Sequence, residues 1–274
     1  MAGARAVIVG ASGRMGRALV RTAGEFPAVR ITGVVASPGS DSLGRDAGLL
    51  AGVEPLGVEV TSDLPAALAA ADVAIDFSRP QATRANIAAC RAAGTPLLIG
   101  TTGFASEVSE AELDAAACDL PLLIAPNTSL GVAVLMELVR RAARALPAEF
   151  DIEIIEAHHR MKRDAPSGTA LALGGAAGEG RGLAPAQALA AASAARTAPR
   201  RQGEIGFAVV RGGEIVGEHT VLFAGPGEEL RLNHRAADRA IFARGALRAA
   251  LWLAAQSPGR YGMSDIIHAA QVLR

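Results

Sequence analysis

The chain has 274 residues, half of them hydrophobic, and its 27 Lys and Arg residues equal its 27 Asp and Glu residues in number. This balance gives no basic excess for nucleic-acid binding, and one Tyr, one Trp and seven Phe residues offer few rings for base stacking. Two cysteines form no disulfide framework, which fits a reducing compartment. The chain leads from Met1 directly into an apolar strand, and no apolar run approaches the ~20 residues that span a bilayer. We therefore expect a cytoplasmic protein without nucleic-acid or membrane partners.

A glycine-rich turn follows the first apolar segment. Residues 5–10 are typical of a buried strand, and the sequence Gly-Ala-Ser-Gly-Arg-Met-Gly then leads into a helical pattern. Gly10 allows a sharp turn, Gly13 removes a Cβ that would block a pyrophosphate, and Gly16 lets the helix pack closely on the strand. The spacing is G-x-x-G-x-x-G rather than the commoner G-x-G-x-x-G, and a plain strand-to-helix turn is the alternative.

The first half of the chain alternates strands with Ala-rich helices, which predicts a parallel sheet. After the first strand, we expect strands at residues 29–35, 72–77, 96–99 and 121–124. Polar or glycine-rich loops follow three of them, at residues 77–80, 100–104 and 125–129. Ligands of open α/β sheets bind beyond the carboxyl ends of the strands, so we expect these loops to line one crevice with residues 10–16.

Two histidines and a lysine stand directly before a helix start in residues 156–173. Residues 151–157 alternate polar and apolar side chains like a half-buried strand, which places His158 and His159 near its end, on opposite sides. Lys162 follows within one loop. The sequence Pro-Ser-Gly-Thr at residues 166–169 then opens a helix that Ser167 or Thr169 can cap and whose first N–H groups can hold a carboxylate. Histidine is a ready acid or base near neutral pH, so the segment favours an anionic substrate that needs a proton.

Each of these side chains has a simpler interpretation. A single histidine or lysine is more often a surface or packing residue, and only the combination of the two histidines with Lys162 favours catalysis. Zinc binding fits poorly, because adjacent histidines on an extended segment diverge, and Cys90 and Cys118 lie far away in helical patterns. We therefore expect no metal.

The pattern changes after a helix predicted over residues 130–146. Three extended runs follow, separated by Arg-Gly-Gly and Gly-Pro-Gly, which are typical of hairpin connections, and they cover residues 204–210, 214–223 and 228–234. They predict a sheet-rich second domain. We expect a short helix with loops over residues 174–202, a helix over 238–253 and a final short element at 261–267.

These motifs, taken together, resemble the 4-hydroxy-tetrahydrodipicolinate reductase (dihydrodipicolinate reductase) family almost from end to end. The matching segments occur in the family's order at residues 10–16, 100–104, 125–132, 156–169 and 212–219. The central segment, Glu-Ala-His-His-Arg-Met-Lys-Arg-Asp-Ala-Pro-Ser-Gly-Thr, is the most specific of them.

The resemblance implies an α/β fold with two domains. Residues 1–126 and 239–274 would form a Rossmann-type parallel-sheet domain that binds the dinucleotide. Residues 127–238 would form an α+β domain that binds substrate and builds a homotetramer. The implied reaction takes a small cyclic dicarboxylate, removes water, and reduces the resulting conjugated imine to tetrahydrodipicolinate with NADPH or NADH, in lysine and diaminopimelate biosynthesis.

The resemblance also implies the roles of individual residues. His158 would exchange a proton with the substrate and Lys162 would be the second proton donor, while His159, Gly168 and Thr169 would hold the carboxylates. The implied cofactor-binding residues are Gly10, Ala11, Ser12, Gly13, Arg14, Met15, Phe77, Arg79, Gly100, Thr101, Thr102, Ala125, Pro126, Asn127 and Thr128.

The choice of coenzyme is left open by the second strand. NAD-preferring folds usually place an Asp or Glu at its end, but here Ala36, Ser37 and Pro38 follow Val35. Without that carboxylate, Ser37 can hydrogen-bond the 2′-phosphate of NADPH and Arg45 can add charge, so we expect both coenzymes to be accepted, with a modest preference for NADPH. The alternative is that Ser37 and Arg45 are solvated loop residues and that NADH binds through other contacts.

Proteins with two other functions would have the same glycine-rich turn near the N-terminus, at residues 10–16. Another Rossmann enzyme, such as an amino-acid or semialdehyde dehydrogenase, would not need the His-His-x-x-Lys and Pro-Ser-Gly-Thr pairing, and its substrate scope would reveal it. A nonenzymatic protein that senses nicotinamide coenzymes would bind them without turnover.

Overall fold

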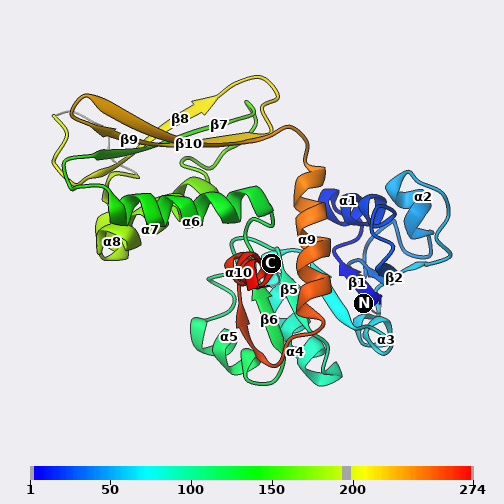
Figure 1. Ribbon diagram of the computed structural model, residues 1–274. Helices are drawn as coiled ribbons and strands as arrows, with labels where there is room; N and C mark the ends of the chain where they lie inside the picture. Colours follow the sequence, from blue (N-terminus) through cyan, green and yellow to red (C-terminus); the bar gives the residue numbers. More distant parts are fainter. Residues whose placement is uncertain (1–2, 193–198, 273–274) are drawn as a thin grey trace. The chain divides into compact units, whose positions relative to one another are not determined.

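The computed structural model describes residues 3–192 and 199–272 (Figure 1). Its contacts divide the chain into two compact units, which are described separately. Unit 1 comprises Met1–Ser129 and Ala240–Arg274, and unit 2 comprises Leu130–Arg239. Within the described ranges, no helix is both long and apolar enough to cross a membrane.

Unit 1 contains one sheet of seven parallel strands in the order β11-β6-β5-β4-β1-β2-β3, which confirms the predicted parallel sheet (Figure 1). The strands β3 and β11 were not predicted as such, because two and three residues carry too little periodicity. The bounds are β1 Ala4–Val9, β2 Val29–Val35, β3 Val60–Thr61, β4 Val73–Asp76, β5 Leu97–Ile99, β6 Pro121–Ile124 and β11 Gly259–Tyr261.

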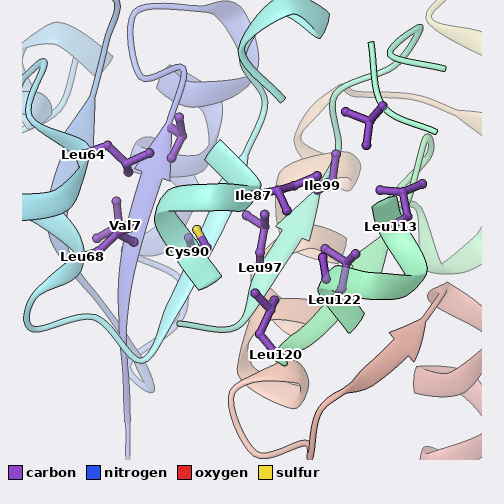
Figure 2. Close-up of a cluster of buried hydrophobic side chains, with 14 of the residues drawn as sticks. Val7, Leu64, Leu68, Ile87, Cys90, Leu97, Ile99, Leu113, Leu120 and Leu122 are labelled. Atoms are coloured by element: carbon purple, nitrogen blue, oxygen red, sulfur yellow. The ribbon is translucent and has the colours of Figure 1, made fainter. Parts of the chain in front are cut away.

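Both faces of this sheet are covered by helices, which explains its almost continuously apolar strands. Figure 2 shows one face, where Val7, Leu97 and Leu122 pack against side chains from α3, α4 and α5. Helices α1 and α9 pack together, and α9 contacts β4 and β5. The helices of unit 1 are α1 Arg14–Ala23, α2 Ala47–Ala51, α3 Leu64–Leu68, the 3-10 helix η1 Pro80–Ala82, α4 Thr83–Ala93, α5 Glu110–Ala117, α9 Ala240–Leu253 and α10 Met263–Val272.

Helix α9 returns the chain to unit 1 after unit 2 is complete. The hydroxyl of Thr128 donates a hydrogen bond of 2.7 Å to the carbonyl of Phe242 in α9. This bond fixes the loop after β6, one of the loops expected to bind a cofactor, although its partner lies 114 residues away in sequence.

Unit 2 is a mixed four-stranded sheet in the order β10-β9-β7-β8, with α6 and α7 along one face (Figure 1). Its core joins Ile152 and Ile154 of β7 to Leu135 and Val139 of α6 and to side chains of α7. The bounds are α6 Leu130–Ala145, β7 Asp151–His158, α7 Gly168–Arg181, α8 Pro185–Ala188, the 3-10 helix η2 Ala190–Ala192, β8 Ile205–Arg211, β9 Gly217–Gly225 and β10 Glu228–Ala236. Within the segment predicted over 174–202, residues 193–198 lie outside the described residues.

One predicted connection in unit 2 is wrong. The Gly-Pro-Gly turn joins the antiparallel neighbours β9 and β10, but the Arg-Gly-Gly segment does not form a hairpin, because β7 lies between β8 and β9. Strand β8 instead pairs in parallel with β7, and β9 starts at Gly217 rather than at Glu214. The Arg-Gly-Gly segment crosses the end of β7, where the Gly212 amide donates to the His158 carbonyl and the Arg160 amide donates to the Gly213 carbonyl.

Candidate functional site

The glycine turn after β1 has the geometry of a phosphate-binding turn. Gly10 has φ +87°, and a Cβ there would lie 2.5 Å from the Phe77 carbonyl oxygen. A Cβ on Gly16 would lie 2.4 Å from the Gly10 carbonyl oxygen, so a larger residue would push α1 away from the turn. Gly13 is the N-cap of α1 and provides no capping side chain, which leaves the first-turn N–H groups for another acceptor. This backbone fits a pyrophosphate group.

A buried carboxylate organises the loops after β4 and β5. Asp76, the last residue of β4, is fully buried. Its Oδ1 accepts hydrogen bonds from the Ser78 amide at 2.7 Å and from the Thr101 hydroxyl at 3.2 Å, and its Oδ2 accepts one from Asn86 at 3.0 Å. The carboxylate therefore ties together β4, the loop after β5 and helix α4.

The predicted cofactor-binding loops meet at one edge of the sheet. They follow β1, β4, β5 and β6, which are neighbouring parallel strands, so all four loops leave from the same side. The Phe77 ring lies against Gly100, where a Cβ would come within 2.3 Å of ring atoms. Three residues of these loops are at least partly exposed: Ser12, Arg79 and Thr102. The buried ones are Ala11, Gly100, Thr101, Ala125 and Thr128.

In unit 2, strand β7 carries the predicted histidine pair. Alternate residues of the strand are buried, and this series begins with the apolar Ile152 and Ile154 and ends with Glu156 and His158. His159 follows the strand and is half-buried. Polar groups therefore occupy the last two positions of an otherwise apolar inward face, and each needs hydrogen-bond partners to offset the cost of burial.

Glu156 has these partners, although sequence analysis assigned it no role. It is 1% exposed, and Arg211 donates to both of its carboxylate oxygens at 2.7 Å. The Ser167 amide donates to it at 3.0 Å, and Nδ1 of His158 lies 2.6 Å from Oε2. Burial raises the pKa of the Glu156 carboxyl, but the hydrogen bonds from Arg211 and His158 outweigh it, so the pKa lies below its ordinary value. Glu156 is therefore ionised at neutral pH.

A second buried histidine, His219 of β9, stands edge-on to His158. The two ring centroids are 5.1 Å apart and the planes are inclined at 71°. Nε2 of His219 lies 3.1 Å from the hydroxyl of Ser167, which also accepts a hydrogen bond from the Ala170 amide and so caps α7, as predicted. Burial, together with the neighbouring His158, lowers the pKa of His219 to about 4, so this ring is neutral at pH 7.

Burial also lowers the pKa of His158, although the hydrogen bond that His158 donates to the Glu156 carboxylate acts in the opposite direction. Lys162 lies in a tight turn, in which its amide donates to the His159 carbonyl at 3.0 Å. Its ammonium group forms an ion pair of 2.7 Å with Asp164, which sequence analysis did not anticipate. The structure thus joins His158 to Glu156, which also accepts a hydrogen bond from the Ser167 amide at the N-cap of α7. Lys162 is close enough to His158 to lower the pKa of its ring.

Gly168 and Thr169 form the first turn of α7, where Gly168 is exposed and Thr169 is half-buried. Arg211 and His219 are the site residues that sequence analysis missed most clearly. A sequence signal existed for Glu156 alone, since a residue two positions before His158 on a strand must share its face. Among the described residues, no group of three or more His, Cys, Asp or Glu side chains has an arrangement suited to a metal ion.

The low pKa of His219 predicts a loss of stability in mild acid. The unfolded histidine binds a proton near pH 6.5 and the folded one near pH 4, so the folded state binds fewer protons between these values. The free energy of unfolding that the neutral His219 contributes is fully present above pH 6.5. It decreases as the pH is lowered, by about 2 kcal/mol between pH 7 and pH 5. We expect His219→Gln to flatten this decline in urea unfolding measured across the same pH range.

The exposed histidine His268 of α10 provides the matched control. His268→Gln should leave the pH dependence of unfolding unchanged. An equal decline in the wild type and in His219→Gln would show that the burial of His219 does not control acid stability.

The chain is similar to known proteins over most of its length. Residues 4–128 match the family model described as the N-terminus of dihydrodipicolinate reductase, and residues 131–267 match the one described as its C-terminus. A protein of Alkalilimnicola ehrlichii named 4-hydroxy-tetrahydrodipicolinate reductase is 53% identical over 263 residues, which cover 96% of this chain and 98% of the relative. A protein of the same name from a Ruegeria species is 51% identical over 261 residues, which cover 95% and 97%.

The fold resembles a solved structure described as dipicolinate-bound dihydrodipicolinate reductase from Paenisporosarcina, with a TM-score of 0.73 and 24% identity over 96% of this chain and 99% of that one. The family models together span nearly the whole chain, and the relatives match it at about half of all positions. The chain belongs to the dihydrodipicolinate reductase family.

Proposed function

We propose that this protein reduces 4-hydroxy-tetrahydrodipicolinate, with loss of water, to tetrahydrodipicolinate in the lysine and diaminopimelate pathway. The name shared by its relatives supports this function. The observation that carries it is the pair of His158 and Glu156 at the start of α7, with Lys162 close enough to lower the pKa of His158, which suits the protonation of a dicarboxylate. The coenzyme is NADH or NADPH, which supplies the hydride.

In this proposal, unit 1 holds the coenzyme. Residues 10–15 bind the pyrophosphate through backbone amides at the start of α1. The loops that contain Phe77, Arg79, residues 100–102 and residues 125–128 line the rest of the site, and Asp76 keeps two of these loops in register. Residues 1–126 and 239–274 would form this domain, and residues 127–238 the substrate and assembly domain.

The residues of unit 2 bind and protonate the substrate. His158 exchanges a proton with it and Lys162 donates a second one. His159 and the amides of Gly168 and Thr169 hold its carboxylates, since the first turn of α7 offers N–H groups and a positive dipole end. The ion pair with Asp164 keeps the Lys162 ammonium group near this turn until an anionic substrate competes for it.

We also propose that the protein is a cytoplasmic homotetramer. The register of unit 2 places Ile155, Val210 and Leu222 on the face of the sheet opposite α6 and α7, and none of the three is buried. The same face also carries polar side chains, such as those of Glu153, Thr220 and Arg231, so assembly through the sheet would join apolar and polar groups. The cytoplasm suits the two free thiols, Cys90 and Cys118.

A coupled assay tests the function directly. The purified protein should oxidise NADH or NADPH, followed by loss of absorbance, when a synthase forms the substrate in situ from pyruvate and aspartate semialdehyde. Oxidation should require both precursors and the synthase. No turnover with either coenzyme would refute the proposal, and turnover of unrelated amino acids or semialdehydes alone would favour another Rossmann dehydrogenase.

His158 and Lys162 should be essential for turnover. Because His158 is assigned to a proton transfer, His158→Gln should lower kcat by ~100-fold or more while coenzyme affinity, measured by fluorescence titration, changes little. Lys162→Met should also impair turnover, since its side chain fills similar space but cannot donate a proton. Near-normal turnover of His158→Gln would remove this residue from the mechanism.

The protein should use both coenzymes, with a modest preference for NADPH. The Arg45 carbonyl accepts a hydrogen bond from Val60 of β3, which pairs with β2 at Val34, so Arg45 lies near the end of β2, where a 2′-phosphate would lie. Arg45→Ala should lower kcat/KM for NADPH but not for NADH. The control Arg30→Ala changes an exposed arginine earlier in β2 and should alter neither value. A strong NADH preference of the wild type would contradict this interpretation.

A further inference from the structure

The carboxylate of Glu156 has more hydrogen-bond partners than charge neutralisation requires. One arginine would balance its charge, yet Arg211 uses both arms of its guanidinium, and the Ser167 amide adds a third donor. The position of Arg211 is itself fixed, because it also donates to the Asp164 carbonyl at 2.7 Å. Glu156 therefore has a fixed position and orientation, which a carboxylate needed only for charge balance would not require.

The partners of Glu156 determine which nitrogen of His158 carries the proton. An ionised carboxylate only accepts hydrogen bonds, and Nδ1 of His158 lies 2.6 Å from Oε2. Nδ1 must therefore carry a hydrogen in the neutral ring. Nε2 then has the free lone pair, and it is the nitrogen that gains or loses a proton when His158 titrates.

The space beside Nε2 is bounded by a glycine. A Cβ on Gly217 of β9 would lie 3.1 Å from Nε2, which is tight enough to displace the ring. The ionisable groups around the ring come from several elements: Glu156 from β7, Lys162 from the following loop, Arg211 from β8 and His219 from β9. Glu156 is the group among these that bonds to Nδ1.

We infer that Glu156, clamped by Arg211 and the Ser167 amide, is a positioning residue that fixes the His158 tautomer and ring orientation, so that Nε2 is the atom that exchanges a proton with the substrate. The assignment of the proton transfer rests on the function proposed above. The tautomer itself is a property of the ligand-free protein. These two parts can therefore be tested separately.

Glu156→Gln tests the tautomer. An amide can donate its own hydrogen to Nδ1, which would move the ring proton to Nε2. Solid-state NMR of protein labelled with ¹⁵N at histidine should show His158 with its proton on Nδ1 in the wild type and a mixture or the reverse in Glu156→Gln. The signals are assigned by their loss in His158→Gln. Glu137 of α6 is the control, because arginines also hold its carboxylate, and Glu137→Gln should leave the tautomer unchanged.

The kinetic readout separates positioning from a structural role. Glu156→Gln should lower kcat by about 100-fold with little change in KM for the substrate. Because Glu156 raises the pKa of His158 against the effect of burial, its loss should also move the alkaline limb of the kcat/KM profile to lower pH. A merely structural role would lower the active fraction without moving that limb.

The variant Glu156→Gln leaves the Arg211 guanidinium without its carboxylate, so the double variant Glu156→Gln with Arg211→Met removes both charges in case the single one does not fold. An unchanged tautomer in a folded variant, or an unmoved pH limb, would overturn the inference. A shifted tautomer in Glu156→Gln, together with no reductase activity in the wild type, would uphold the positioning by Glu156 and refute the proposed function instead.

Discussion

The buried Glu156 carboxylate is the interaction on which the histidine site of unit 2 depends. Its acceptor oxygens join β7, β8 and the segment before α7, because Arg211 and the Ser167 amide both donate to them. An unpaired carboxylate at this depth would cost several kcal/mol, so these donors stabilise the fold as well as the site. The same bonds that make the burial tolerable also orient His158. Stability and site geometry thus share one set of hydrogen bonds.

Unit 1 also has a buried, hydrogen-bonded carboxylate at the end of a strand, here β4. Asp76 is buried, and its hydrogen bonds join the loop after its own strand, the loop after β5 and helix α4. In both units, therefore, an acid near the carboxyl end of a central strand holds the neighbouring segments in place. The residues expected to contact ligand are supported by these acids, and the loops need not be rigid on their own.

Sequence patterns predicted the local structure and the parallel sheet of unit 1 well, but not the strand pairing of unit 2. The strands at residues 29–35 and 121–124 have the predicted bounds, and Ser167 caps α7. The hairpin between β8 and β9 was wrong because turn chemistry describes only the adjacent residues, whereas the place of β7 between them follows from pairing across the sheet. Arg211 and His219 reach the site through that same pairing, so the segment at residues 212–219 gave His219 no role and Arg211 had no local signal.

The parallel pairing of β7 with β8 has a consequence for how the protein is made. Glu156 leaves the ribosome well before Arg211, which lies 55 residues later, and the strand that brings His219 is later still. Until β8 docks, the carboxylate is hydrated and nothing but local contacts restrains His158. Long loop closure slows such pairing. A nascent or truncated chain can therefore hold the complete histidine-lysine motif without forming the site, and proton-transfer competence arises only when the sheet closes.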